Sequence, residues 1–136
     1  MAGESPILAL RDLTKTFSGH NAVDHVDLDI REGEMFTIVG PSGCGKTTLM
    51  RLAAGLDVPT SGRVLVGGVE VVEPGPDRAV VFQQFALFPW KTVAENITFG
   101  LRCKGMPEAQ RSERIRHYIQ LMGLEGREDA YPHQLS

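Results

Sequence analysis

The sequence predicts an α/β fold, and three consecutive features indicate it. Residues 35–39 (MFTIV) are almost all apolar or β-branched, which suits a strand buried on both faces of a parallel sheet. A Gly-rich stretch follows at residues 40–45. From Lys46 to Ala54, good helix formers carry apolar residues at helical spacing, and Gly55 can end that helix. Strand, Gly-rich loop and helix in this order begin a βαβ unit.

Shorter strands are predicted on both sides of this unit. Residues 7–13 mix apolar and polar positions, and residues 26–30 alternate with the two-residue period of a half-buried strand. Residues 63–66 and 69–72 are separated by a Gly-Gly dipeptide, which predicts a hairpin. Residues 79–82 (AVVF) have the composition of another short buried strand.

The pattern becomes helical after Pro89. Thr92 and Glu95 have the spacing of a capping box, in which each side chain bonds the other residue's backbone N–H group. Pro107 suits the first turn of a second helix, and Gly123 is expected to end it. One apolar face is expected on that helix, formed by Ile115, Tyr118, Ile119 and Met122.

Composition and charge narrow the possible partners. The chain has 136 residues, a formal net charge of -3 and 42% hydrophobic residues, which fits one domain and does not favour nucleic acid as a partner. Cys44 and Cys103 lie far apart, which indicates neither a disulfide framework nor a zinc site and fits a reducing cytosol. Residues 1–13 lack the pattern of a secretory signal, and no apolar run is long enough to span a membrane.

The segment from Gly40 to Thr47 (GPSGCGKT) matches G-x-x-x-x-G-K-[ST], the Walker A pattern. Its glycines let successive backbone N–H groups point inward around an anion, and the helix that follows adds its positive end. Lys46 is expected to contact the β and γ phosphates of ATP, and the Thr47 hydroxyl to bind Mg²⁺. The predicted nucleotide-binding residues of this loop are Gly40, Pro41, Ser42, Gly43, Cys44, Gly45, Lys46, Thr47 and Thr48.

Three segments resemble the ATPase subunit of an ATP-binding cassette (ABC) importer: GPSGCGKTTLMRLAAGL, VVFQQFALFPWKTVAENITFGL and YPHQLS. The resemblance extends from about Ile7 to Ser136. It implies a P-loop NTPase fold of the ABC ATPase type. Its N-terminal portion would comprise an antiparallel β subdomain, the start of the RecA-like core and most of the helical subdomain. A single, incomplete domain is expected, with residues 1–85 in the core and β subdomain and residues 90–135 in the helical subdomain.

The resemblance also implies roles for residues outside the Walker A loop. Phe17 would stack on adenine with Ala22 beside the ring, and Gln83 would occupy the Q-loop position, where it binds Mg²⁺ and the attacking water. Lys46 and Gln83 are therefore the expected catalytic residues, and Thr47 and Gln83 the expected metal ligands. Residues 85–90 would lie near the surface that contacts the membrane-spanning partner.

The implied function is ATP binding and hydrolysis that powers transport of a small solute. The implied partners are membrane-spanning permease subunits and a second ATPase subunit arranged head to tail, at the cytoplasmic face of the cell membrane. The sequence ends two residues into the family signature LSGGQ, and the Walker B Asp, catalytic Glu and switch His are not found in it. The 136-residue chain is therefore expected to turn over ATP inefficiently alone and to be poorly soluble.

Two other functions remain compatible with the loop: a soluble P-loop kinase or NTPase unrelated to transport, and a non-catalytic nucleotide-binding or interaction module. Three residues also have purely structural alternatives, Phe17 as a core aromatic, Gln83 as an unremarkable glutamine and Trp90 packed under a loop. For the solute, Pro89-Trp90 resembles importers of nitrate, sulfonate and taurine. The preceding residues 85–88 resemble importers of polyamines or iron as much.

Overall fold

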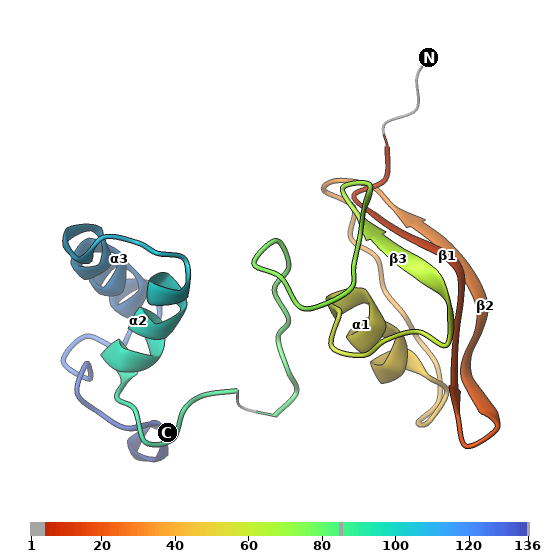
Figure 1. The fold of residues 1–136 in the computed structure, drawn as a ribbon. Helices are drawn as coiled ribbons and strands as arrows, with labels where there is room; N and C mark the ends of the chain where they lie inside the picture. Colours follow the sequence, from red (N-terminus) through yellow and green to blue (C-terminus); the bar gives the residue numbers. More distant parts are fainter. Residues whose placement is uncertain (1–4, 85, 136) are drawn as a thin grey trace. The chain divides into compact units, whose positions relative to one another are not determined.

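A computed structural model describes residues 5–84 and 86–135 (Figure 1). The chain forms two compact units, one up to Val80 and one from Val81 on. Each unit is described by itself. The expected division into a nucleotide-binding core (residues 1–85) and a helical subdomain (residues 90–135) stays a prediction.

The first unit contains a four-stranded sheet in which every neighbouring pair of strands is antiparallel. The strands are β1 (Leu8–Phe17), β2 (His20–Ile30), β3 (Ser61–Val66) and β4 (Val69–Glu70), in the order β2-β1-β3-β4. The predicted antiparallel part of the fold is confirmed. β1 and β2 are longer than their apolar patterns indicated, and β4 is shorter. Gly67 and Gly68 have φ values of 55° and 81°, as a tight hairpin turn between β3 and β4 requires.

Helix α1 (Lys46–Ala54) contacts β1 and β2 in the first unit (Figure 1). It begins and ends where the sequence predicts. Gly55 adopts a φ of 75° and donates its N–H to the Leu52 carbonyl, one of the last carbonyls of the helix, which regular helical bonds leave without a partner. A residue with a Cβ atom adopts this backbone conformation less readily than glycine. Leu52 of this helix packs against buried apolar residues of the sheet to form one cluster. The cluster consists of Leu10, Leu13, Val23, Leu52 and Val64.

The prediction that residues 35–39 and 79–82 form buried strands is wrong for this structure. Neither segment pairs with any strand among the described residues, and Met35, Val39 and Val81 are 94%, 88% and 97% exposed. A central strand of a parallel sheet needs a hydrogen-bonded neighbour on each side and cover on both faces. The strands of the antiparallel sheet pair with one another and supply neither, so these apolar segments form no strand and are largely exposed.

The second unit holds α2 (Val93–Cys103), α3 (Glu108–Leu121) and a short 3₁₀ helix, η1 (Pro132–Gln134). The predicted capping box is confirmed: the Glu95 N–H donates to Thr92 Oγ1 over 3.3 Å, and the Thr92 N–H donates to Glu95 Oε2 over 2.8 Å. Pro107 precedes the first turn of α3. The expected apolar face of α3 is only partly correct, because Ile119 is buried but Met122, at the C-terminal cap, is 60% exposed.

The loop after α3 returns to the start of α2. The N–H groups of Val93 and Ala94 donate to the carbonyls of Ala130 and Glu128, at 2.9 and 3.0 Å. These bonds satisfy two of the free N–H groups that every helix start presents. None of the helices in the described part of the chain combines the length and the apolar content that crossing a bilayer requires.

Candidate functional site

The Gly-rich loop turns into α1 through residues with positive φ. Gly43 has a φ of 81° and Gly45, the N-terminal cap of α1, a φ of 97°. A Cβ atom at Gly45 would overlap the carbonyl oxygen of Ala22 in β2. Gly40 is also tightly placed, since a Cβ there would lie 2.7 Å from Cys44 Sγ. The loop therefore lies against β2 at a distance that only glycine permits.

The ammonium group of Lys46 lies over this loop. Its Nζ donates to the carbonyl oxygens of Gly40 and Pro41 at 2.7 and 2.6 Å, and it lies 3.5 Å from Cys44 Sγ. These contacts hold a positive charge on the same side of the loop as the start of α1. No carboxylate takes part in them, so the charge of Lys46 is not neutralised by an ion pair within the described residues.

The N-terminus of α1 has the features of an anion site. Gly45 supplies no side-chain cap, and the first turn, Lys46–Leu49, contains no acidic residue. The Leu49 N–H donates to the Gly45 carbonyl over 2.8 Å. The N–H groups of residues 46–48 and the positive end of the helix dipole are therefore the part of this turn that is open to an anion. The Thr47 side chain is exposed beside them, and Thr48 is half-buried. These residues fit a polyphosphate and its Mg²⁺, although their roles as ligands stay predictions.

A cavity of about 380 Å³ lies between this loop, α1 and β2. Cys44 and Lys46 line it from the loop and the helix, and Ala22 and Asp24 line it from β2. Ala22 was predicted to lie at the nucleotide site, and the structure brings it together with the Walker A residues. Asp24 was not predicted, because only the pairing of β2 beside the loop places its carboxylate there.

Phe17 ends β1 and is 49% exposed, so it does not belong to the buried core. Lys15 Nζ lies 5.1 Å from the centre of its ring. A half-exposed aromatic face of this kind can stack on a planar base. Stacking of Phe17 on adenine remains a prediction.

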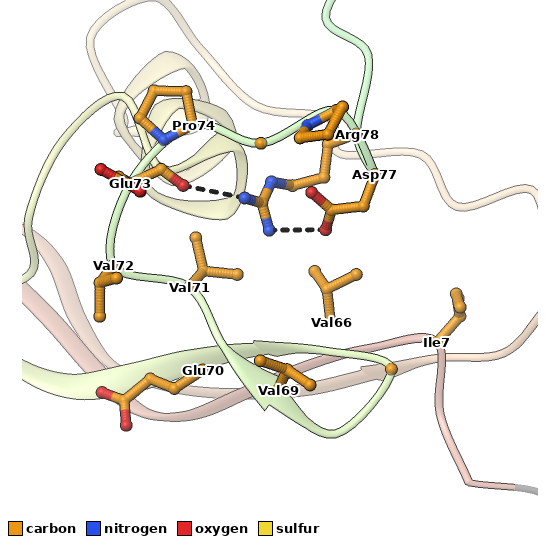
Figure 2. A pocket seen from close by; sticks show the side chains of 13 residues that line it. Ile7, Val66, Val69, Glu70, Val71, Val72, Glu73, Pro74, Asp77 and Arg78 are labelled. Atoms are coloured by element: carbon orange, nitrogen blue, oxygen red, sulfur yellow. Dashed lines mark hydrogen bonds and ion pairs between the residues drawn. The ribbon is translucent and has the colours of Figure 1, made fainter. Parts of the chain in front are cut away.

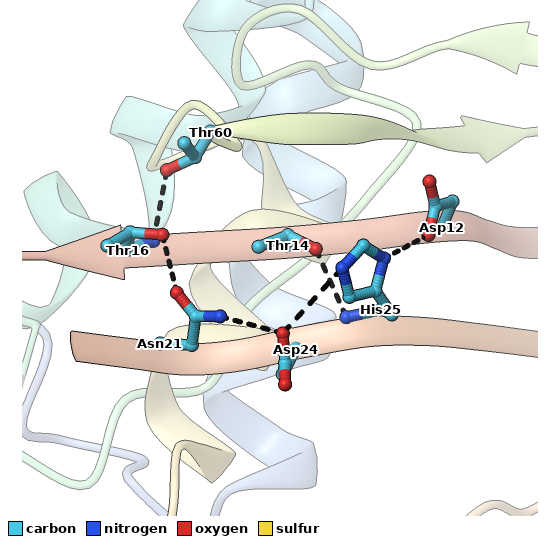
Figure 3. Close-up of polar contacts among 7 residues, drawn as sticks. All are labelled: Asp12, Thr14, Thr16, Asn21, Asp24, His25 and Thr60. Atoms are coloured by element: carbon cyan, nitrogen blue, oxygen red, sulfur yellow. Dashed lines mark hydrogen bonds and ion pairs between the residues drawn. The ribbon is translucent and has the colours of Figure 1, made fainter. Parts of the chain in front are cut away.

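A polar network joins β1 and β2 beside the cavity (Figure 3). The His25 ring nitrogen Nδ1 lies 2.6 Å from Asp12 Oδ1, and the backbone N–H of His25 donates to Thr14 Oγ1 over 3.1 Å. Asn21 Nδ2 donates to Asp24 Oδ1 over 2.7 Å. Asp12 and His25 have φ values of 48° and 47°, and the register of the two strands shifts around them. The sequence pattern did not predict this network, because irregular pairing is not visible in alternation alone.

The network makes stability depend on pH. The hydrogen bond that the protonated ring donates to Asp12, the charge of Asp12 and the charge of Asp24 raise the pKa of His25. Protonated His25 therefore stabilises the folded state fully below its ordinary pKa of about 6.5, and the contribution is lost as pH rises through the higher folded pKa.

In the variant His25→Gln, we expect the thermal midpoint to fall less between pH 5 and pH 9 than it does in wild type. His117→Gln, in the other unit, is the control; equal pH profiles for wild type and His25→Gln would contradict the assignment.

The other predicted residues lie in the second unit. Gln83 is exposed, and its expected contact with the same Mg²⁺ as Thr47 stays a prediction. Phe85 and Ser136 lie outside the described residues. Trp90 is 70% exposed, which does not fit the alternative that it packs under a loop.

A larger hollow of about 640 Å³ lies beside the β3–β4 hairpin (Figure 2). Its walls are mainly aliphatic, with Val66, Val69 and Val71 among them. Arg78 is the cation among the described residues that line it, and its guanidinium is already engaged: Nη1 pairs with Asp77 at 3.0 Å, and Nη2 donates to the Glu73 carbonyl over 2.8 Å. The described residues of this hollow therefore offer phosphates no unengaged positive charge, and the smaller cavity at the Gly-rich loop fits a nucleotide better.

Comparisons with known proteins agree with the geometry. Residues 23–136 match the family model described as ABC transporter. The chain therefore belongs to the ABC transporter family of ATP-binding proteins, whose members hydrolyse ATP. It is 53% identical over 133 residues to an uncharacterized ABC transporter ATP-binding protein of Methanocaldococcus jannaschii, covering 95% of this chain and 50% of that protein.

Two further relatives carry names of importers. A nitrate import ATP-binding protein of Synechocystis is 43% identical over 95% of this chain and 50% of its own length. An Fe(3+) ions import ATP-binding protein of Pasteurella multocida is 41% identical over 95% of this chain and 38% of its own. The chain thus spans half, or less, of the length of these relatives.

A solved structure shares the fold. It is a dimeric ATP-binding cassette in a post-hydrolysis state with bound ADP and Pi. It superposes with a TM-score of 0.80 at 32% identity and covers 95% of this chain and 63% of the other. The α/β P-loop NTPase fold of the ABC type, predicted from the sequence, is confirmed.

Proposed function

We propose that this chain binds Mg·ATP through residues 40–48 and serves as the energy-coupling subunit of an ABC importer. The observation that carries the proposal is the Gly43–Gly45 turn at the uncapped start of α1, with the Lys46 ammonium folded over it. The free N–H groups at the helix start and the Lys46 ammonium, which forms no ion pair among the described residues, lie at the same end of α1. That arrangement suits the three phosphates of a nucleotide better than a neutral ligand.

Each residue has a distinct proposed task. The N–H groups at the start of α1 bind phosphate oxygens, and Lys46 exchanges its bonds to the Gly40 and Pro41 carbonyls for phosphate contacts. Thr47 and Gln83 hold Mg²⁺, which offsets the phosphate charge. Phe17 stacks on adenine, with Ala22 beside it. In this proposal the phosphates supply most of the affinity and the base supplies a smaller part.

A nucleotide series tests this division. Equilibrium titration with Mg·ATP, Mg·ADP and AMP is expected to give affinities that fall in this order, because each step removes phosphate contacts to Lys46 and the helix start. Phe17→Ala should weaken the binding of all three nucleotides by a similar factor, since base stacking contributes about 1–3 kcal/mol and does not depend on the phosphates. Equal affinity for AMP and ATP would contradict a phosphate-centred site.

Turnover is expected to need more than the residues that bind. Attack on the γ-phosphate requires a group that orients water, and none was identified among these 136 residues besides Gln83. We therefore predict that the 136-residue polypeptide binds Mg·ATP but releases phosphate slowly. Phosphate release by the purified polypeptide is the measurement. Rapid turnover that disappears in Lys46→Ala would refute this prediction.

The proposed partners are membrane-spanning permease subunits and a second ATP-binding subunit placed head to tail, at the cytoplasmic face of the membrane. The relatives named for import support an importer. The proposed cargo is a small solute. The Pro89-Trp90 pair and the relative named for nitrate favour an anion such as nitrate, sulfonate or taurine, and the relative named for Fe(3+) makes iron the second candidate.

A further inference from the structure

A tight turn precedes α2 in the second unit. The Lys91 N–H donates to the Phe88 carbonyl over 3.1 Å, which closes a β-turn with Pro89 at its second position. Proline is favoured at the second position of a β-turn because its ring fixes φ near the value that the turn requires there. Trp90 follows at the tip of the turn and is 70% exposed.

The side chain of Asn96, in the first turns of α2, holds this turn. Asn96 Oδ1 accepts the Phe88 N–H at 2.9 Å, and Nδ2 donates to the Phe88 carbonyl at 3.2 Å. The same Nδ2 also donates to the carbonyls of Lys91 and Thr92, at 3.0 and 2.9 Å. A carboxamide is suited to this place because it offers both an acceptor and two donor hydrogens. Both ends of the turn are therefore tied to one half-buried side chain.

Aromatic packing fixes the inner side of the turn. The Phe88 ring lies edge-on to Phe99 of α2, with 4.6 Å between ring centres, and 5.7 Å from the centre of Trp90. Phe88 is thus held twice, through its backbone by Asn96 and through its ring by Phe99. Leu87 and Trp90, on either side of Phe88 and Pro89, are 48% and 70% exposed.

We propose that Asn96 is a positioning residue, which fixes the place of Leu87 and Trp90 on α2. This inference rests on the proposed function and on the implication of the family resemblance that the segment containing Leu87 and Trp90 lies near the surface that contacts the membrane-spanning partner. A turn held in one conformation before the partner binds needs no further ordering on docking. Movement of α2 would also be passed to the turn that carries Trp90, because Asn96 and Phe99 of α2 hold Phe88 directly.

Asn96→Asp tests the role without changing the size of the side chain. It removes both donor hydrogens and places a carboxylate against three carbonyl oxygens. At neutral pH, exchange of the hydrogen-bonded amides in residues 86–92 is expected to rise roughly five- to 150-fold, the factor that corresponds to the cost of about 1–3 kcal/mol for leaving a polar group unsatisfied. Exchange in residues 97–103 of α2 should stay as in wild type. Thr98→Val, which removes a 2.6 Å bond to the Ala94 carbonyl in the same helix, is the matched control and should leave residues 86–92 unchanged.

A pH signature separates positioning from general loss of stability. In acid, the introduced carboxyl gains a proton and can again donate one hydrogen bond while accepting the Phe88 N–H. After correction for intrinsic rates, Asn96→Asp should recover protection of residues 86–92 in acid, whereas Asn96→Ala should not. Wild-type exchange in Asn96→Asp at neutral pH, the same increase in Thr98→Val, or no recovery in acid would overturn the inference.

A nucleotide titration distinguishes this inference from the proposed function. Asn96→Asp is expected to keep the wild-type affinity for Mg·ATP, because the side-chain hydrogen bonds of Asn96 are made to Phe88, Lys91 and Thr92 of its own unit. Altered affinity in that variant would count against the positioning role. If the wild-type protein binds no Mg·ATP at all, the proposed function fails, and the exchange results still decide the role of Asn96.

Discussion

Gly45→Ala is expected to abolish measurable binding of Mg·ATP. The substitution adds one methyl group, which would overlap the Ala22 carbonyl oxygen. Rotation of a side chain cannot relieve this contact, because both partners are fixed to backbone. The φ of 97° at Gly45 adds a strain of roughly 1–2 kcal/mol for any other residue. Either the loop or β2 must move, and both line the cavity.

Gly43→Ala provides the matched control. Gly43 has a similar φ of 81°, but a Cβ atom there would meet nothing within 4 Å. This variant should therefore show the backbone strain alone, with a small fall in the thermal midpoint and retained, weaker binding. Calorimetric titration and thermal unfolding of both variants measure the difference. Equal binding by Gly45→Ala and Gly43→Ala would show that the contact with Ala22 is unimportant.

Lys46→Ala is expected to weaken Mg·ATP binding by roughly a hundredfold. A hydrogen bond to a charged group contributes about 1.5–3 kcal/mol, and the Lys46 ammonium lies against the loop, 2.7 and 2.6 Å from the Gly40 and Pro41 carbonyl oxygens. The fold should survive, since Lys46 is only half-buried and its bonds in this structure are to loop carbonyls. Fluorescence titration with a labelled nucleotide measures the loss.

The control for Lys46→Ala is Lys104→Ala, at the C-terminal cap of α2. It removes one positive charge from the second unit and leaves the loop intact. Its affinity for Mg·ATP is expected to equal that of wild type. Similar losses in the two variants would mean that net charge, and not the position of Lys46, governs binding.

Features set by neighbouring residues could be predicted from the sequence. Helix α1 with its Gly55 cap, the Gly67-Gly68 turn and the Thr92–Glu95 capping box all formed where expected. Each depends on contacts within a few residues, so the local pattern contains the information. The Walker A spacing likewise placed Gly45 and Lys46 at the helix start.

Features set by distant partners could not be predicted. Residues 35–39 have the composition of a central strand, but a strand also needs neighbours, and the described residues pair none with it. Asp24 at the cavity and His25 beside Asp12 depend on register shifts between β1 and β2. Asn96 looks like an ordinary helix residue until the turn at Phe88 is seen against it. These sites arise from pairing and packing, which spacing along one segment does not record.

Amide exchange of the Gly-rich loop, measured with and without Mg·ATP, tests the central claim most directly. The account predicts that saturating Mg·ATP slows exchange of the amides from Gly43 to Thr48, because their N–H groups bind phosphate oxygens. Residues 108–121 of α3 should be unaffected, and Lys46→Ala should show little slowing at the same concentration. Unchanged exchange from Gly43 to Thr48 at saturating Mg·ATP, or protection only in the second unit, would contradict it.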